Sequence, residues 1–210
     1  MMWWGSDTNG WRRRMTAEWV PTSHGEPISV REFDALPVDT SHRYEIENGL
    51  LLVNARPAPK HSRALSRTVE QLNAQLPEGW EAFAEVEAEF SGRSPRRVPD
   101  IVVIPVEAAE QTRIRSDQIA LAIEVATSGQ SAVRDYIVKS REYAANNIAC
   151  YWVIDLLDVD GDEVGLTIYT LEEPGKYTYG PRLSGTVVVS EPFPLKLDLN
   201  AIVGQRSVRR

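Results

Sequence analysis

The sequence predicts a mixed α/β fold in which helices flank a central β-sheet. Three apolar runs, at residues 101–104, 119–125 and 151–156, are hydrophobic on both faces, as the interior strands of a covered sheet are. Two amphipathic segments, residues 60–76 and 132–146, have the spacing of helices with one buried face. The chain of 210 residues, 42% of them hydrophobic, is long enough for one domain with a substantial core.

Local signals define the elements that precede the first long helix. Ser29 and Glu32 have the spacing of a capping box, which predicts a short helix that begins at this point. Asn48-Gly49 separates two strand-like runs, residues 43–47 and 50–54, and this dipeptide is the strongest short-range signal of a β-hairpin.

The middle of the chain predicts the strands of the sheet and their connections. Residues 80–90 alternate small or apolar residues with glutamates, as a strand with one solvated face does. The polar segment 107–118 connects two interior strands and is compatible with a helix. Strand 119–125, helix 132–146 and strand 151–156 form one crossover unit, so the two strands are expected to run parallel.

The C-terminal third predicts antiparallel strands added to this mixed sheet, because short runs alternate with turns at Asp160-Gly161, Pro174-Gly175 and Gly180-Pro181. We expect one domain over residues 29–203, with a basic C-terminal tail at residues 204–210. Residues 1–28 lack periodicity and predict a flexible N-terminal arm, in which Met15 is an alternative start. A basic arm that contacts nucleic acid stays an open alternative.

Cysteine content and hydropathy favour a cytoplasmic protein. The single cysteine, Cys150, excludes an internal disulfide and a cysteine-based zinc cluster. No run approaches the length of a transmembrane helix, and the first residues lack the apolar core of a signal peptide. We therefore expect a soluble cytoplasmic protein with no membrane partner.

The formal net charge of −7 argues against strong sequence-independent DNA binding, because lysine and arginine supply most of that affinity by neutralising phosphates. Acidic metal ligands would add to this negative charge. Basic residues are nevertheless gathered at Arg93, Arg96 and Arg97, just before Pro99-Asp100. This cluster is either a nucleic-acid contact or a solvated loop.

Two carboxylates stand in apolar runs that predict buried strands: Asp100 follows Val98-Pro99, and Glu124 lies between Ile123 and Val125. Withdrawing an ionised carboxylate from water costs several kcal/mol unless a charge, a hydrogen bond or a metal compensates. The sequence therefore predicts a metal site, with Lys139 as a candidate cation on the helix that follows. The alternative is that Asp100 caps a turn and Glu124 pairs with an arginine.

These residues belong to an ordered series of motifs. In chain order the motifs are Tyr44-Glu45-Ile46-Glu47-Asn48-Gly49-Leu50-Leu51, Pro57-Ala58-Pro59-Lys60-His61, Pro99-Asp100, Ile123-Glu124-Val125-Ala126-Thr127-Ser128, Asp135 to Lys139 to Tyr143, and Tyr151-Trp152-Val153-Ile154-Asp155. Together they resemble the Uma family of endonucleases, members of the PD-(D/E)XK restriction-endonuclease-like superfamily. The resemblance covers about residues 31–199 and implies a restriction-endonuclease-like core.

The resemblance also implies a reaction and a cofactor. Enzymes of this superfamily hydrolyse phosphodiester bonds in DNA with a divalent cation, and oxygen ligands select Mg²⁺ or Mn²⁺. It assigns Asp100 and Glu124 as metal ligands, together with the backbone carbonyl of Val125. A homodimer is compatible with the resemblance, because many of these endonucleases pair to cut both strands, but no surface patch in the sequence marks an interface.

Lys139 is where the sequence departs from the superfamily pattern. A lysine two residues after the acidic ligand would lie on the same strand face, but that position is Ala126. The Uma pattern instead places its lysine in the following helix, where Lys139 stands. An α-helical wheel puts Lys139 at the margin, Asp135 and Glu142 opposite the buried stripe, and Tyr136, Ile137, Ser140, Tyr143 and Ala144 on that stripe. A solvent-facing Asp135–Lys139 pair, worth a few tenths of a kcal/mol, is therefore the alternative.

Four further residues are candidates for the site. Glu45 lies between Tyr44 and Ile46, whose side chains should face the other side of the strand, and the resemblance implies that such an early glutamate completes or orients the site. Glu45 on an exposed hairpin face is the alternative, and Glu47 competes for the same role. His61, Arg97 and Tyr143 are candidate substrate-binding residues, although a lone histidine at a helix start is more often structural or exposed. Asp155 ends a strand, where we expect a turn role.

Two classes of function stay open. The first is a metal-dependent endonuclease that acts on DNA, and the retained Asp100, Glu124 and Lys139 favour it. The second is a catalytically inactive module of the same fold that binds nucleic acid or a protein partner, which the net negative charge and the displaced lysine favour. The choice between DNA and RNA, and any sequence specificity, lie beyond what the sequence indicates.

Overall fold

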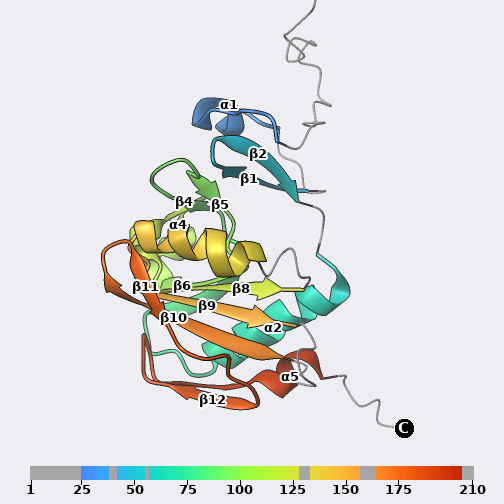
Figure 1. The fold of residues 1–210 in the computed structure, drawn as a ribbon, viewed down its shortest axis with the longest axis vertical. Helices are drawn as coiled ribbons and strands as arrows, with labels where there is room; N and C mark the ends of the chain where they lie inside the picture. Colours follow the sequence, from blue (N-terminus) through green and yellow to red (C-terminus); the bar gives the residue numbers. More distant parts are fainter. Residues whose placement is uncertain (1–24, 38–41, 55–56, 128–132, 157–163, 205–210) are drawn as a thin grey trace, which may run out of the picture.

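The computed structural model describes residues 25–37, 42–54, 57–127, 133–156 and 164–204. A six-stranded sheet with the order β11-β10-β9-β8-β6-β3 forms its centre, which confirms the predicted mixed α/β class. The strands are β3 (Trp80–Ala84), β6 (Ile101–Pro105), β8 (Leu121–Ala126), β9 (Cys150–Asp155), β10 (Gly165–Glu173) and β11 (Lys176–Tyr179). Figure 1 shows the sheet between α4 on one side and α2 with α5 on the other.

The strand directions agree with the predicted crossover. Strands β8 and β9 pair in parallel, and the other neighbours in the sheet pair antiparallel. Strands β10 and β11 join at Pro174-Gly175, where Gly175 has a positive φ of 80° as a tight turn requires. The predicted turn at Asp160-Gly161 lies outside the described residues.

Each face of the sheet covers its own apolar cluster. Helix α2 (Pro59–Asn73) packs its apolar stripe on one face, beside α5 (Leu199–Val203) and the hairpin of β12 (Thr186–Val189) with β13 (Leu195–Asp198). Helix α4 (Ser140–Ala145) covers the other face, where an aromatic cluster that includes Tyr143 and Tyr151 fills the space. Because both faces are covered, β6, β8 and β9 are apolar except at Glu124 of β8 and Asp155 of β9.

A small unit lies beside the sheet, at the top of Figure 1. Strands β1 (Arg43–Glu47) and β2 (Leu50–Asn54) form the predicted hairpin, with φ values of 53° at Asn48 and 81° at Gly49. Helix α1 (Val30–Asp34) carries the predicted capping box between Ser29 and Glu32. Gly25 and Ile28 donate backbone hydrogen bonds to this hairpin, so residues 25–28 belong to the unit and not to the expected arm.

Two sequence expectations need correction in the middle of the chain. Residues 80–90 are not one strand, because the chain turns at Glu85 (φ 55°) and continues as β4 (Ala88–Glu89). The segment 107–118 contains two short 3₁₀ helices, η1 (Val106–Glu110) and η2 (Ser116–Gln118), separated by β7 (Ile114–Arg115). Strand β4 pairs with β7 and with β5 (Arg96–Arg97), which places Arg96 and Arg97 in a buried strand and not in a solvated loop.

Within the described residues, no helix is both long and apolar enough to cross a membrane.

Candidate active site

Asp100 and Glu124 lie side by side on one face of the sheet. Strands β6 and β8 pair Ile101 with Ile123, so the same register continued by one residue sets Asp100 opposite Glu124. Side chains alternate along a strand, and both carboxylates therefore face the layer that contains α4. Both residues are buried, with exposed fractions of 3% and 1%. The two predicted metal ligands are thus brought together.

Asp100 accepts hydrogen bonds from three different elements. Arg43 of β1 donates to Oδ1 at 3.0 Å, and the Val125 backbone N–H donates to Oδ2 at 2.8 Å. His61, in the first turn of α2, places Nε2 3.1 Å from the same Oδ2. Burial alone would raise the pKa of Asp100, but the hydrogen bond to His61 and the charges of Lys139 and Arg43 outweigh it. The pKa therefore lies well below its ordinary value, and Asp100 is an anion.

Glu124 lies between a lysine and a tyrosine. The Lys139 ammonium is 2.6 Å from Oε2, and the Tyr143 hydroxyl donates to Oε1 at 2.5 Å. Burial, with the neighbouring charges of Asp100 and Asp135, raises the pKa of Glu124 to about 8 against the opposing effect of Lys139. Burial and the Glu124 charge also raise the pKa of Tyr143 well above its ordinary value, so its hydroxyl remains a donor.

Lys139 reaches this position because the helix begins with a wide turn. Residues Arg134–Lys139 form a π-helix, η3, which α4 continues. Asp135 and Lys139 are buried at 5% and 4% exposure, whereas Ile137 is 48% exposed. The α-helical wheel was therefore wrong for these residues, since a π turn has more residues than an α turn and shifts the buried face. The Asp135–Lys139 pair exists, at 3.5 Å, but it is buried and not solvent-facing.

Glu45 reaches the site from the hairpin. It is 1% exposed, while Ile46 packs into the separate apolar cluster of the hairpin unit, as the strand alternation predicts. The Val98 backbone N–H donates to its Oε1 at 3.0 Å, and Asn54 donates to Oε2 at 2.7 Å. Burial would raise the pKa of Glu45, but the charges of Lys139, Arg97 and Arg43 together lower it. The exposed-hairpin alternative therefore does not hold.

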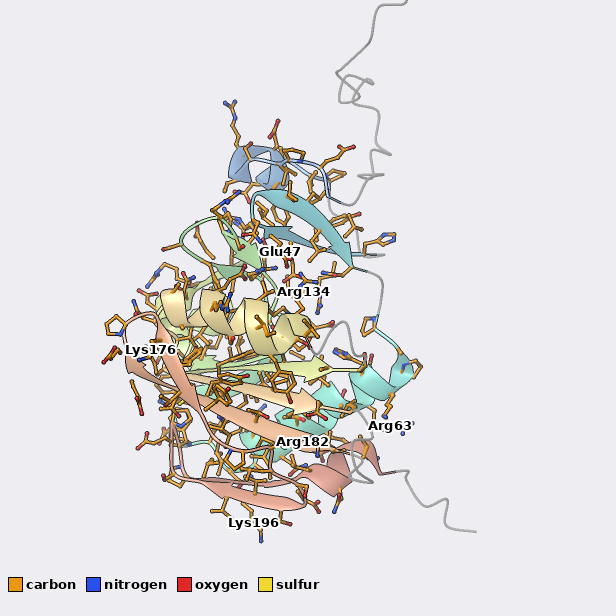
Figure 2. All side chains as sticks on the ribbon, in the orientation of Figure 1. Glu47, Arg63, Arg134, Lys176, Arg182 and Lys196 are labelled. Atoms are coloured by element: carbon orange, nitrogen blue, oxygen red, sulfur yellow. The ribbon has the colours of Figure 1, made fainter. Side chains whose placement is uncertain are left out.

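Arg97 joins the hairpin to the helix. Its side chain is fully buried, and it donates to Glu142 of α4 through Nε at 2.9 Å and to Glu47 of β1 through Nη1 at 3.0 Å. Arg134 of η3 pairs with the same Glu47, and Figure 2 shows these two side chains meeting between the hairpin and the helix. Because the Arg97 guanidinium donates to carboxylates of β1 and α4, its contacts favour a role in holding the hairpin against the helix over direct contact with the substrate.

Roles in substrate binding stay predictions for the other candidates. Tyr143 is fully buried and directs its hydroxyl at Glu124. His61 is 9% exposed, and its buried Nδ1 has no hydrogen-bond partner among the described residues. The Val125 N–H donates to Asp100, and the role of the Val125 carbonyl as a metal ligand stays a prediction.

Sequence reasoning missed two members of the site region. Arg43 precedes Glu45 by two residues on the same strand face, a period-2 signal that could have linked it to the site. Asp155 was expected in a turn, but it is buried at the end of β9, where Arg182 donates to both carboxylate oxygens at 2.9 and 3.0 Å. Tyr136 of η3 also donates to Asp155, at 2.7 Å. No local pattern links Asp155 with Arg182 across this distance in sequence.

A family model matches most of the chain. The family model described as "Uma2: Putative restriction endonuclease" matches residues 30–201. This chain belongs to the Uma2 family. The resemblance expected from the motifs is thereby confirmed, and membership of this family supports a nuclease.

A solved structure shows the same fold. The crystal structure of "a putative nuclease belonging to DUF820 from Anabaena variabilis ATCC 29413" is similar to this chain with a TM-score of 0.63 and 22% sequence identity. The match covers 84% of this chain and 98% of that chain. No curated protein matches the chain.

Proposed function

We propose that this protein is a divalent-metal-dependent endonuclease that hydrolyses phosphodiester bonds in DNA. The observation that carries the proposal is the buried group of Asp100, Glu124 and Lys139, which lies within the residues matched by the family model. Burying two carboxylates and an ammonium inside a protein is costly even when their charges are paired, and a catalytic role accounts for their convergence at this position.

The charge of the surrounding cluster favours a divalent cation. Its carboxylates are Glu45, Glu47, Asp100, Glu124, Asp135 and Glu142, and its permanent cations are Arg43, Arg97, Arg134 and Lys139. Of these described residues, the carboxylates exceed the cations by two charges when all are ionised, and the charges of Asp100 and Asp135 add to the effect of burial in raising the pKa of Glu124. A divalent cation would neutralise it.

The donor set also suits magnesium or manganese. Among the described residues, no group of three or more acidic, histidine or cysteine side chains is arranged as a metal cage. Mg²⁺ is usually held by one or two carboxylates and keeps several waters, so Asp100 and Glu124 are sufficient protein ligands. The carbonyl of Val125 is a further proposed ligand. When bound, the cation would polarise a phosphoryl oxygen and lower the pKa of a coordinated water.

The residues around the two ligands have separate roles in this proposal. Arg43 and the Val125 N–H orient Asp100, while the Tyr143 hydroxyl orients Glu124. The Lys139 ammonium would stabilise the negative charge that develops on the phosphoryl group, an effect that is largest in the transition state. Glu45 adds negative charge that holds the surrounding cations in place.

One observation favours the alternative, a catalytically inactive module that binds nucleic acid or a protein. Each carboxylate oxygen of Asp100 and Glu124 already accepts a hydrogen bond or ion pair from the protein. A cation must therefore compete with Lys139 for Glu124. Metal binding is the property that separates the two functions.

The test is metal-linked stability followed by cleavage. A cation at 100 times its Kd stabilises the folded state by about 2.7 kcal/mol, which raises Tm by about 5–10 °C for a domain of this size. We expect this shift with Mn²⁺ or Mg²⁺ and its loss in Asp100→Asn, whereas Asp117→Asn, at an exposed ion pair, should behave like the wild type. Cleavage of DNA substrates should show the same dependence. An unchanged Tm together with no cleavage in millimolar Mn²⁺ would favour the binding module.

A further inference from the structure

The turn that carries Lys139 has π-helical and not α-helical geometry, and side chains of the neighbouring sheet contact this turn. π turns are rare and occur mostly as single turns within helices. Sharp departures from α-helical hydrogen bonding arise where a side chain inserts at the backbone carbonyls. In this protein, side-chain hydroxyls donate hydrogen bonds to carbonyls of the π-helix η3.

Two tyrosines of the sheet donate to carbonyls of η3. Tyr151 of β9 donates its hydroxyl to the Asp135 carbonyl at 2.8 Å, and Tyr169 of β10 donates to the Tyr136 carbonyl at 3.3 Å. Ser140 donates to the same Tyr136 carbonyl at 2.7 Å. These carbonyls lie in the turn between Asp135 and Lys139, the two residues that the wide turn directs inward.

Neighbouring aromatic rings hold the two donors in place. Tyr151 is fully buried, and its ring centroid lies 4.8 Å from that of Tyr143 and 5.4 Å from that of Tyr169. Edge-to-face and tilted pairs of this kind are favourable and restrict ring movement. The hydroxyl of Tyr151 therefore has one well-defined position, below the Asp135 carbonyl.

We propose that Tyr151 and Tyr169 are positioning residues that hold η3 in its wide turn and thereby keep the Lys139 ammonium against Glu124. They act through the carbonyls of Asp135 and Tyr136. For its catalytic consequence this inference rests on the proposed nuclease function, but the placement of Lys139 can be measured without it.

Lysine acetylation measures that placement directly. The sequence has lysine at positions 60, 139, 176 and 196 and nowhere else. Lys139 is buried, whereas the other three are exposed, and Figure 2 shows Lys176 and Lys196 at the edge of the molecule. The full-length protein would be treated with a water-soluble acetylating reagent in metal-free buffer, and the rate at each lysine would be read by peptide mass spectrometry.

Tyrosine-to-phenylalanine variants remove the hydroxyls and keep the rings. We expect Tyr151→Phe to raise the acetylation rate of Lys139 by at least about tenfold, since a buried carbonyl loses its partner, and Tyr169→Phe to raise it by a smaller factor. The matched control is Tyr177→Phe. Tyr177 lies in the same aromatic cluster and donates at 2.7 Å to Ile148, away from η3, so its loss should leave the Lys139 rate within about twofold of wild type.

The outcomes separate positioning from general loosening and from failure of the proposed function. Protection of Lys139 that is unchanged in Tyr151→Phe and Tyr169→Phe would overturn the inference, and so would an equal rise in Tyr177→Phe. If Tyr151→Phe does not fold, Tyr169→Phe tests the inference, with the smaller rise in the Lys139 rate expected for it. A rise confined to Lys139 supports the inference even where the wild type cleaves no DNA. Where it does cleave, kcat should fall in Tyr151→Phe while KM stays constant.

Discussion

Replacing Lys139 with methionine would remove a buried ammonium while leaving a side chain of similar length. The ammonium lies 2.6 Å from Glu124 and 3.5 Å from Asp135, and it is 4% exposed. Removing one partner of a buried ion pair typically costs about 3–5 kcal/mol, because the remaining charge is left unpaired. A surface lysine would cost less than about 0.5 kcal/mol. The buried position therefore predicts a large loss of stability.

The loss should depend on pH, because Glu124 can escape the unpaired state by keeping a proton. Its pKa is raised to about 8 in the folded protein, above the value of about 4.5 expected in the unfolded chain. A raised pKa contributes stability that is full below the unfolded value and is lost as the pH rises through the folded value. At pH 6 Glu124 is protonated with or without Lys139, whereas at pH 9 the wild type has an ionised Glu124 paired with the ammonium.

Without Lys139 the pKa of Glu124 rises further, and each unit of that rise is worth about 1.4 kcal/mol. We therefore expect Lys139→Met to lower the free energy of unfolding by about 3–5 kcal/mol at pH 9, and by at least about 1 kcal/mol less at pH 6. Urea unfolding in metal-free buffer at both pH values measures the difference. Lys196→Met, at an exposed position, is the control. A loss below 1 kcal/mol at pH 9, or an equal loss at both pH values, would refute the reasoning.

Two further substitutions test ion pairs that do not involve the proposed metal ligands. Arg97→Met should lower the free energy of unfolding by about 3–5 kcal/mol, since the buried carboxylate of Glu45 and the part-buried carboxylates of Glu47 and Glu142 lose a cation. Arg93→Met at an exposed position should change it by less than about 1 kcal/mol in the same urea assay. Gly165→Ala should cost about 1–3 kcal/mol, because the new Cβ would lie 2.0 Å from Nε of Arg182 and displace that guanidinium from Asp155. A Gly165→Ala change made in an Arg182→Met background should then cost little, and fully additive losses would contradict this explanation.

The sequence alone was sufficient wherever the signal is local. Asn48-Gly49 specifies the hairpin because both residues adopt the positive φ that its turn requires. The Ser29 and Glu32 capping box specifies its helix through bonds that span three residues. The apolar runs of β6, β8 and β9 likewise identified the interior of the sheet, since strands covered on both faces have no polar alternation. The order of the motifs was enough to identify the family.

Tertiary structure decided the environment of the charged residues. A wheel of 3.6 residues per turn placed Lys139 at the margin of the buried face. In the structure the turn is wider and buries Lys139, and tyrosine hydroxyls from β9 and β10 donate hydrogen bonds to carbonyls of this turn. Arg97 looked like part of a basic surface loop, yet it meets carboxylates from β1 and α4 that lie 50 and 45 residues away along the chain, respectively. Such pairings depend on how strands and helices pack, and no periodicity within one element encodes them. Local residue order therefore determined the elements, and long-range packing determined which charges meet at the candidate site.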